Sequence, residues 1–536
     1  MNPTASQPGS LFSLRAAACG VVLLWAALYL PCLGTVEMKG EEGRRTLPAV
    51  AMIESGNWMV PSVGGESYAR KPPLLNWSIA LVIGATGVVN EWTARLPSAL
   101  AVLPMALGML LFLRRLLGLD TALLATVMYL VNATMLEKGR LAELESYTIT
   151  TYGLAFLAWL HGEVHGSKLV RWILPGLFLS LGQMTKGPMP LLLFFYLPVG
   201  LHLWQTKRMR ELLSPAHLVC VAITWLPFVI WSRLMMRQMG AETVSNVWSQ
   251  ELAMRVVPPD FSLGGYLEVI LRGFLNFMPW VFFLPLLWRS AVLQRLPEAQ
   301  HGLFLAVRRA LVVGFIVVGC LPGARPRYTI QLLIPLFVLL AWAMAQSDLP
   351  KCWLGWRRLL QGLAVIAALG ALGGAGYLRV GIGLWLLAAA IAGAAVVIAR
   401  RLGQFSHPQE LGWATGWVAA LTLGVAWLAL LGLGERLPSP ERRAAREIAA
   451  WLPPGAHLIA VRPGYERILA HLGFGVRYAP GLKELPGERP LFLFAKQPDD
   501  LEQLRHTADA VKLPTTNHLK GREFELWRLD GKPPAP

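Results

Sequence analysis

Apolar runs long enough to cross a lipid bilayer recur along most of this chain. A helix needs about 20 residues to cross a hydrocarbon layer of ~30 Å, and such runs extend from residue 16 to residue 432 and then stop. Lipid offers no hydrogen bonds to an open backbone, so the runs predict a bundle of transmembrane helices. We expect about thirteen spans, near residues 14–34, 96–113, 120–136, 148–163, 170–185, 188–204, 215–234, 268–287, 310–321, 328–345, 358–376, 380–399 and 412–432.

Composition and charge agree with a polytopic membrane protein. Hydrophobic residues make up 55% of the chain and charged residues only 15%, which excludes a soluble multidomain enzyme. The net charge of +17 does not predict a nucleic-acid partner, because the basic residues stand at the ends of apolar runs. They cluster in alternate loops, at Arg114–Arg115, Lys168 with Arg171, Lys207–Arg208, Lys351 with Arg357–Arg358, and Arg400–Arg401.

These clusters follow the positive-inside rule if the N-terminus is cytoplasmic. An odd number of spans then puts the C-terminal tail outside, so a bacterial inner-membrane protein with a periplasmic tail is expected. The first outer loop, 35–95, is long and rich in Glu, Pro and Gly. Its apolar segment 72–89 is short for a span, and we interpret it as a helix in the membrane interface.

The tail has the composition of a small soluble domain. A helix is expected to start at Ser439-Pro440-Glu441, with Ser as the cap. Strands are expected at 457–461 and 491–495, and further helices near 464–472 and 498–508. The sequence therefore predicts two domains: a transmembrane domain over 1–433 that includes the first outer loop, and an α/β domain over 434–536.

Polar residues gather on the predicted outer face, at 41–45, 70–77, 137–145, 246–260 and 325–328. Ionisable residues near a bilayer are costly and tend to be functional. The adjacent carboxylates Glu41 and Glu42 could supply a general base, although a solvated loop has the same composition. Lys71 precedes two prolines that fix its position, and the guanidinium of Arg327 can bind phosphate bidentately.

Nucleotide and metal cofactors are not predicted. Lys186 stands in Thr185-Lys186-Gly187-Pro188, which lacks the spacing of a phosphate-binding P-loop. The chain contains one His-x-x-x-His pair, His161 and His165, but no Cys/His set with metal-ligand spacing. On helical spacing, Arg140 would lie near Glu137 and Glu143, where structural ion pairing is the alternative to a functional role.

Several of these strings, in order and with matching spacing, resemble one known family. The sequence is similar to the GT-C glycosyltransferases that use polyprenyl-phosphate sugars, namely the protein O-mannosyltransferases and, most closely, the bacterial lipid A aminoarabinose transferases. The resemblance covers residues 10 to about 345 and is carried by Glu41-Glu42-Gly43-Arg44, Ser55 to Pro61, Lys71 to Trp77, Asn90 to Leu100, Arg140 to Glu145, Thr185 to Pro188, Pro279-Trp280 and Arg325 to Tyr328.

The resemblance implies a GT-C fold and roles for particular residues. It implies catalytic acids at Glu41 and Glu145, where the family has Asp, with Glu42 beside the first. The donor phosphate would be held by Lys71, Arg255, Arg327 and Tyr328. Acceptor or structural contacts are expected from Arg44, Arg140 and Lys186. The residue before the motif lysine is often Glu in the family and is Arg70 here, so a divalent metal is not expected.

The expected reaction moves a sugar from undecaprenyl phosphate to an extracytoplasmic acceptor, with inversion at the anomeric carbon. Aminoarabinose and lipid A are the favoured donor sugar and acceptor, and a hexosyl or mannosyl transferase acting on protein or glycan is the alternative within the family. A transporter of lipid-linked sugars remains as an interpretation of a different class, because any protein with many spans could be one. A non-catalytic lipid-sugar binder also remains, because the two Asp-to-Glu exchanges lengthen both acids by one methylene.

Overall fold

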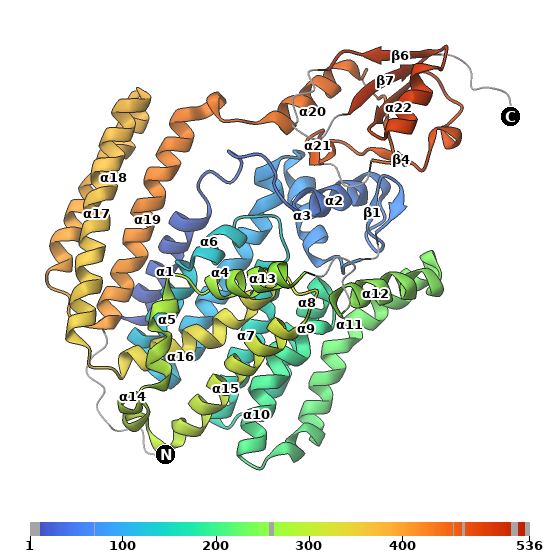
Figure 1. The fold of residues 1–536 in the computed structure, drawn as a ribbon. Helices are drawn as coiled ribbons and strands as arrows, with labels where there is room; N and C mark the ends of the chain where they lie inside the picture. The colour runs from blue at the N-terminus through green and yellow to red at the C-terminus, as the bar shows by residue number, and fades with distance from the viewer. Residues whose placement is uncertain are drawn as a thin grey trace.

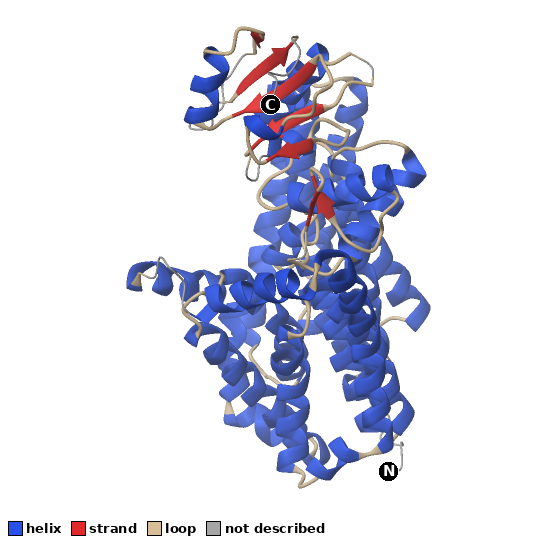
Figure 2. Ribbon diagram, turned by 90° about the vertical axis from the view of Figure 1, so that its right-hand side faces the viewer, coloured by secondary structure: helices blue, strands red, loops and turns tan. Residues whose placement is uncertain are grey.

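The computed structural model describes residues 11–68, 70–256, 262–453, 455–463, 467–515 and 524–530. A large helical bundle carries a small α/β unit at one end (Figures 1 and 2). The first half of the bundle contains α1 (Leu14–Tyr29), α2 (Gly43–Ser55), α3 (Leu74–Thr86), α4 (Glu91–Leu117), α5 (Leu119–Leu130), α6 (Ala133–Lys138), α7 (Glu145–His165), α8 (Lys168–Lys186), α9 (Met189–Leu191), η1 (Leu192–Tyr196), α10 (Leu197–Gln205), η2 (Met209–Leu213), α11 (Pro215–Met239) and α12 (Ala241–Val256).

The second half is equally helical and ends at the connection to the α/β unit. Its elements are α13 (Leu263–Leu275), η3 (Trp280–Trp288), α14 (Ser290–Arg295), α15 (Glu298–Cys320), η4 (Pro326–Leu332), α16 (Leu333–Ala345), α17 (Pro350–Leu378), α18 (Ile382–Leu402), α19 (Pro408–Leu433) and η5 (Gly434–Arg436).

All thirteen predicted apolar segments overlap helices, which confirms the helical membrane fold. Within the described ranges, seven helices are long and apolar enough to cross a membrane, or eight if one bent pair counts as a single span. The number thirteen stays a prediction, because helices such as α1 and α5 are apolar but short, with 16 and 12 residues.

The predicted continuous span 268–287 is wrong. The chain breaks there into α13 and η3, which are bent by 85°. Asn132 donates from Nδ2 to the carbonyls of Asn276 and Met278 at 2.9 and 2.8 Å, and the side-chain amide of Asn276 donates to the carbonyl of Pro326 at 2.7 Å. These bonds satisfy backbone groups that a helix would pair internally, and Pro279 removes a donor, so the break is stable.

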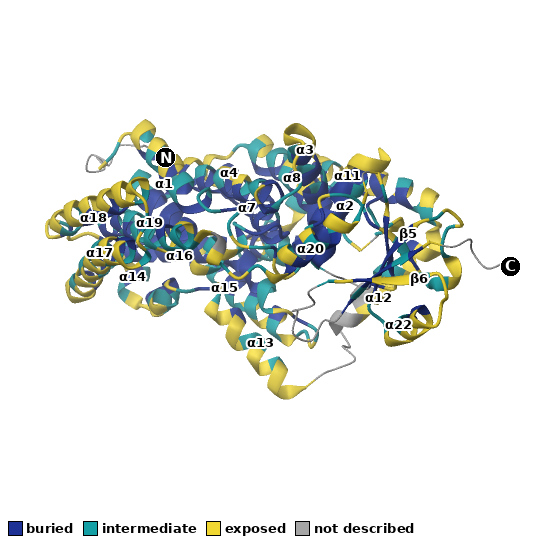
Figure 3. Ribbon diagram, turned by 90° about the horizontal axis from the view of Figure 1, so that it is seen from above, coloured by how far each residue is buried: buried dark blue, intermediate teal, exposed yellow. Residues whose placement is uncertain are grey.

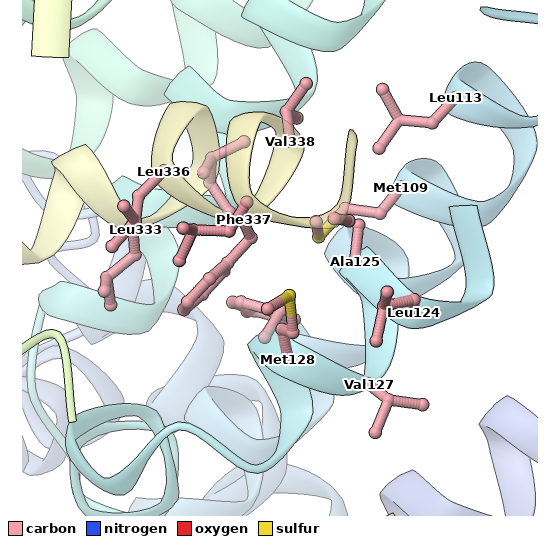
Figure 4. Close-up of a cluster of buried hydrophobic side chains, with 14 of the residues drawn as sticks. Met109, Leu113, Leu124, Ala125, Val127, Met128, Leu333, Leu336, Phe337 and Val338 are labelled. Atoms are coloured by element: carbon pink, nitrogen blue, oxygen red, sulfur yellow. The ribbon is translucent and has the colours of Figure 1, made fainter. Parts of the chain in front are cut away.

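The centre of the bundle is α16, almost all of whose residues are buried. Leu333, Phe337 and their neighbours pack against Met128 of α5 and Met109 of α4 (Figure 4). By contrast, α17 and α18 keep many exposed apolar side chains along their outer faces (Figure 3). An apolar surface of this kind is stable in contact with lipid.

The α/β unit contains α20 (Pro440–Trp451), α21 (Arg467–Ala470), α22 (Pro498–Arg505), the short 3-10 turn η6 (Leu482–Glu484) and five strands. The strands are β3 (Leu458–Val461), β4 (Arg477–Ala479), β5 (Leu491–Ala495), β6 (Ala510–Leu513) and β7 (Glu525–Leu529), in the order β4-β3-β5-β7-β6. β3 is parallel to both β4 and β5, whereas β7 is antiparallel to β5 and β6.

The predictions of β3, β5, α20 and α22 are confirmed, and the sequence pattern missed the other three strands. The expected helix 464–472 is described only as α21, because residues 464–466 lie outside the described ranges. Ser439 precedes α20 but makes no capping hydrogen bond with its side chain.

Three contacts fix the α/β unit onto the first outer loop. The amide of Tyr478 donates to the carbonyl of Gly64 at 2.7 Å, in the turn between β1 (Ser62–Val63) and β2 (Glu66–Ser67). The amide of Gly475 donates to Oε1 of Glu54 at 2.6 Å. Arg442 forms an ion pair with Glu91 at 2.5 Å. The unit therefore sits at the end of the bundle formed by α2, the hairpin and the start of α4.

Gly64 offers a test of this docking. It has a φ of +63°, and a Cβ atom there would lie 2.1 Å from the Tyr478 ring, whereas Gly65 has a φ of +90° and open space around its Cα. Both Gly64→Ala and Gly65→Ala introduce backbone strain, but only the first pushes the α/β unit away. We expect Gly64→Ala alone to increase the rate of proteolysis between residues 433 and 440 in the intact chain; equal cleavage of the two variants would contradict the docking.

Candidate active site

A polar cavity of about 320 Å³ lies between the first outer loop, the start of α7, the end of α8 and the segment before η4. Seven cationic side chains and three carboxylates line it. This excess of positive charge favours an anionic ligand. The cavity brings together seven of the ten residues that the sequence nominated: Glu41, Arg44, Lys71, Glu145, Lys186, Arg327 and Tyr328.

Glu41 lies among three guanidinium groups. Its Oε1 is 3.2 Å from both Arg325 Nη1 and Arg327 Nη2, and its Oε2 is 3.3 Å from Arg45 Nη2. Partial burial by itself would raise the pKa of Glu41, but the positive charges of Arg327, Arg45 and Arg325 outweigh burial and lower this pKa to about 2. The carboxylate is therefore ionised at neutral pH.

Arg327 connects the two predicted catalytic acids. In addition to its contact with Glu41, its Nε lies 3.6 Å from Oε1 of Glu145. That distance is too long for a hydrogen bond, and this buried nitrogen has no hydrogen-bond partner among the described residues. An anion entering the cavity could accept from it.

Glu145 begins α7 and is only 2% exposed. Lys186, the last residue of α8, reaches Oε1 of Glu145 at 3.3 Å, and its Nζ also lies 5.5 Å from the centre of the Tyr328 ring. Burial favours the neutral acid, but the charges of Lys186 and Arg327 lower the pKa of Glu145 overall.

Glu143 is the third carboxylate of the cavity. Burial and the nearby charge of Glu145 raise its pKa, against the opposing effect of Lys138, whose Nζ lies 3.0 Å from Oε2 of Glu143. The pKa values of two carboxylates only two residues apart are thus shifted in opposite directions by their surroundings.

Glu42 was predicted beside Glu41 as a catalytic acid, but it does not line the cavity. Its side chain is fully buried and forms a bidentate pair with Arg95, with 2.8 Å between Nε and Oε1 and 2.8 Å between Nη2 and Oε2. The amides of Ala142 and Lys39 also donate to it, each at 2.9 Å. All this bonding capacity is used inside the protein, so the structure assigns Glu42 a structural role.

Arg140 also lies away from the cavity. It donates to the carbonyls of Leu28 and Pro31 at 2.9 and 2.5 Å, and stacks over the ring of Trp427 at 5.3 Å. The expected ion pairs with Glu137 and Glu143 do not form, because α6 ends at Lys138 and the helical spacing is lost. Arg255 belongs to α12, and its side chain lies outside the described residues.

The cavity includes side chains that the sequence analysis did not nominate. Arg45, Tyr68, Glu143 and Arg325 all line it, together with Arg70. A sequence signal existed for two of them: Arg45 is one helical turn after Glu41, and Arg325 is two residues before Arg327. Tyr68 had no such signal, since its place depends on the turn of the β1–β2 hairpin.

An apolar groove of about 510 Å³ adjoins the cavity. Its walls come from η1, α10 and the end of α15, with Leu193, Phe194 and Val318 among the lining side chains. Lys186 and Tyr328 line both the groove and the cavity. A ligand with a charged head and a long apolar chain would therefore find a continuous site.

The buried pair of Glu42 and Arg95 generates a stability prediction. Glu42→Gln leaves the Arg95 guanidinium buried without its counterion, which should cost about 3 kcal/mol or more of unfolding free energy. The exposed pair of Lys39 and Glu137, 3.5 Å apart, is the matched control; Glu137→Gln should cost at most about 0.5 kcal/mol. The 21 tryptophans allow thermal unfolding to be followed by fluorescence. Equal unfolding midpoints for the two variants would disprove the structural role of Glu42.

Comparisons with known proteins show which families this chain resembles. The family model for dolichyl-phosphate-mannose-protein mannosyltransferases matches residues 70–231. An undecaprenyl phosphate-alpha-4-amino-4-deoxy-L-arabinose arabinosyl transferase from Pseudomonas aeruginosa is 28% identical, over 84% of this chain and 76% of its own. A protein of the same name from Yersinia enterocolitica is 26% identical over 60% of this chain and 58% of its own.

The fold is also known from experiment. The crystal structure of ArnT from Cupriavidus metallidurans bound to undecaprenyl phosphate superposes with a TM-score of 0.70, at 18% identity, over 96% of this chain and 97% of that one. The apo form of the same protein gives a TM-score of 0.66. The chain is therefore a multi-pass membrane protein of the GT-C superfamily, whose members are glycosyltransferases that use polyprenyl-phosphate sugars.

Proposed function

We propose that this enzyme transfers 4-amino-4-deoxy-L-arabinose from undecaprenyl phosphate to lipid A at the periplasmic face of the inner membrane. The names of its relatives support the donor sugar and its carrier. In this proposal the transmembrane domain comprises residues 1–433, the N-terminus is cytoplasmic, and the domain 434–536 is periplasmic. Arg44 and Arg45 of α2 line the cavity, and α2 lies beside the α/β unit (Figure 1), which supports placing both outside.

The continuity of the apolar groove with the cationic cavity carries this proposal. The polyprenyl chain would lie in the groove, and its phosphate would enter the cavity at Lys186 and Tyr328, which line both. Lys71, Arg325 and Arg327 also line the cavity and could hold the phosphate charge. Arginine suits this role because its planar guanidinium can donate two parallel hydrogen bonds to phosphate.

The reaction breaks the bond between the anomeric carbon and the phosphate oxygen. The bonding electrons leave with the polyprenyl phosphate, positive charge builds on the sugar ring, and an acceptor oxygen forms the new bond from the opposite face. Cations fixed before the reaction stabilise the departing phosphate without having to reorganise, which is generally the largest catalytic effect available to such a site. The configuration of the anomeric carbon inverts.

The state of Glu41 supports a phosphate acceptor. With its pKa near 2, Glu41 is a weak base, whereas efficient general bases have a pKa near the operating pH. A hydroxyl acceptor has to lose a proton during transfer, but an ionised phosphate on lipid A does not. Glu41 would then keep Arg45, Arg325 and Arg327 oriented and would stabilise positive charge on the sugar. Transfer to a protein hydroxyl, the alternative within the superfamily, would require a stronger base.

The first test is turnover of radiolabelled undecaprenyl-phosphate aminoarabinose in membranes that contain the wild-type chain or Glu41→Gln, with lipid A as acceptor. We expect transfer by the wild type and a loss of roughly 100-fold or more in the variant, as for removal of one fixed charge from an active site. Donor binding should persist in both proteins. Binding without turnover by the wild type would contradict the proposal and favour a lipid-sugar binder.

The charges around Glu41 also predict the pH dependence of transfer. Wild-type Glu41 stays ionised until the pH falls toward 2, so it should not limit the rate between about pH 4 and pH 8. Arg325→Gln removes one of three cations that lower the pKa of Glu41. Protonation of Glu41 should therefore begin at higher pH, and the acid limb of the kcat/KM profile should shift to higher pH. Arg505→Gln, a change in the ion pair with Glu525 on the α/β unit, should leave the profile in place.

A further inference from the structure

A second cleft adjoins the cavity on a different side from the apolar groove. It encloses about 750 Å³ between the β1–β2 hairpin, α12 and one edge of the α/β unit. Arg44, Tyr68 and Arg70 line both the cleft and the cavity, whereas the cleft and the groove have no lining residue in common. The cavity therefore has two separate approaches.

The two approaches differ in chemistry. The groove is lined mainly by aliphatic and aromatic side chains, which suits a polyprenyl chain. The cleft has a mixed lining: Arg44, Arg70 and Arg462 supply positive charge, Glu66 is the one acidic side chain among its described lining residues, and most of the others are apolar. Its position outside the bundle and its positive charge suit the anionic headgroup of a lipid more than an apolar chain.

One wall of the cleft comes from the α/β unit, at an edge where open α/β sheets generally bind ligands. Arg462 and Pro463 follow β3, and Pro480 follows β4, at the carboxyl ends of two parallel strands. The chain runs from β3 to its neighbour β4 and then returns to β5 on the other side of β3. Open α/β sheets generally bind their ligands beyond the carboxyl ends of their strands.

Arg462 is held in place by its own neighbours. Asp500, which is buried, accepts from Nε and Nη2 of Arg462 at 2.9 and 2.6 Å. The side chain of Arg462 is still 41% exposed. Its φ of +41° is unfavourable for an L-residue, and its amide donates to the carbonyl of Ala479 at 3.0 Å. Residues kept in strained conformations by their surroundings concentrate at ligand sites.

We infer that the cleft between the first outer loop and the α/β unit binds the phosphorylated headgroup of the acceptor lipid, with Arg462 as the contribution of the α/β unit. This inference rests on the proposed function, and it identifies the side from which the acceptor arrives. The donor enters through the groove at Lys186 and Tyr328, and the acceptor phosphate enters past Arg44 and Arg70. Separate entries allow both lipids to be bound at once, as displacement from opposite faces of the sugar requires.

Arg462→Asn is the sharpest test of the cleft. Asparagine tolerates a positive φ better than most residues, so the variant removes the charge without adding backbone strain. Asp500→Asn is introduced with it, because the buried Asp500 would otherwise lose its counterion. Arg462→Lys retains the charge. With full-length protein in nanodiscs, we expect Arg462→Asn to raise the KM for a diglucosamine bisphosphate lipid roughly tenfold, as for loss of one charge-assisted hydrogen bond. The KM for the donor and kcat should be unchanged, and Arg462→Lys should recover most of the affinity.

Direct binding separates this inference from the proposed function. The same bisphosphate lipid and its dephosphorylated form are titrated into wild-type protein, Arg462→Asn and the control Arg505→Gln without any donor. Weaker binding of the bisphosphate form by Arg462→Asn alone supports the cleft, even if no sugar is ever transferred. Equal binding by all three proteins, or an equal loss for both lipid forms, overturns it. Absence of turnover by the wild type, with binding intact, would contradict only the proposed function.

Discussion

The ion pair between Glu42 and Arg95 is the constraint on which the active-site end of the molecule depends. Arg95 lies one turn into α4 and donates to the carbonyls of Leu33 and Val36 as well as to Glu42. Glu42 in turn accepts from the amide of Ala142. One buried carboxylate and one buried guanidinium therefore join the first outer loop, α4 and the turn before α7. The neighbours of these anchors, Glu41 and Glu143, line the cavity as a result.

The cavity combines excess positive charge with two carboxylates, Glu41 and Glu145, that are held ionised. Arg327 is within 4 Å of both Glu41 and Glu145, and Lys186 adds a second cation at Glu145. The carboxylates keep these cations in fixed positions, and the cations keep the carboxylates charged. Such an arrangement stabilises charge that appears during a reaction, because its dipoles and charges are already oriented. It is poorly suited to removing a proton from a neutral hydroxyl, and this supports phosphate as the acceptor group.

The position of the α/β unit against the first outer loop creates the cleft. Its contacts at Gly64, Glu54 and Glu91 hold the carboxyl ends of β3 and β4 beside Arg44 and Arg70. The cleft exists only between the two parts, so neither the bundle nor the unit could form it separately. Membrane helices thus line the groove that we assign to the donor, whereas the loop and the α/β unit together line the cleft that we assign to the acceptor.

The sequence by itself determined the membrane bundle, the α/β tail and half of the cavity residues, because hydropathy depends on local composition and the motifs of the superfamily keep their spacing. It could not separate Glu41 from its neighbour Glu42, since adjacent residues have the same local chemistry but opposite surroundings once α4 supplies Arg95. The ion pairs expected of Arg140 were wrong for a related reason: a helix that ends at Lys138 removes the spacing on which they relied. The bend at 276–279, the contribution of Tyr68 and the cleft at Arg462 were decided by the tertiary structure alone, because each depends on contacts between segments far apart in the chain.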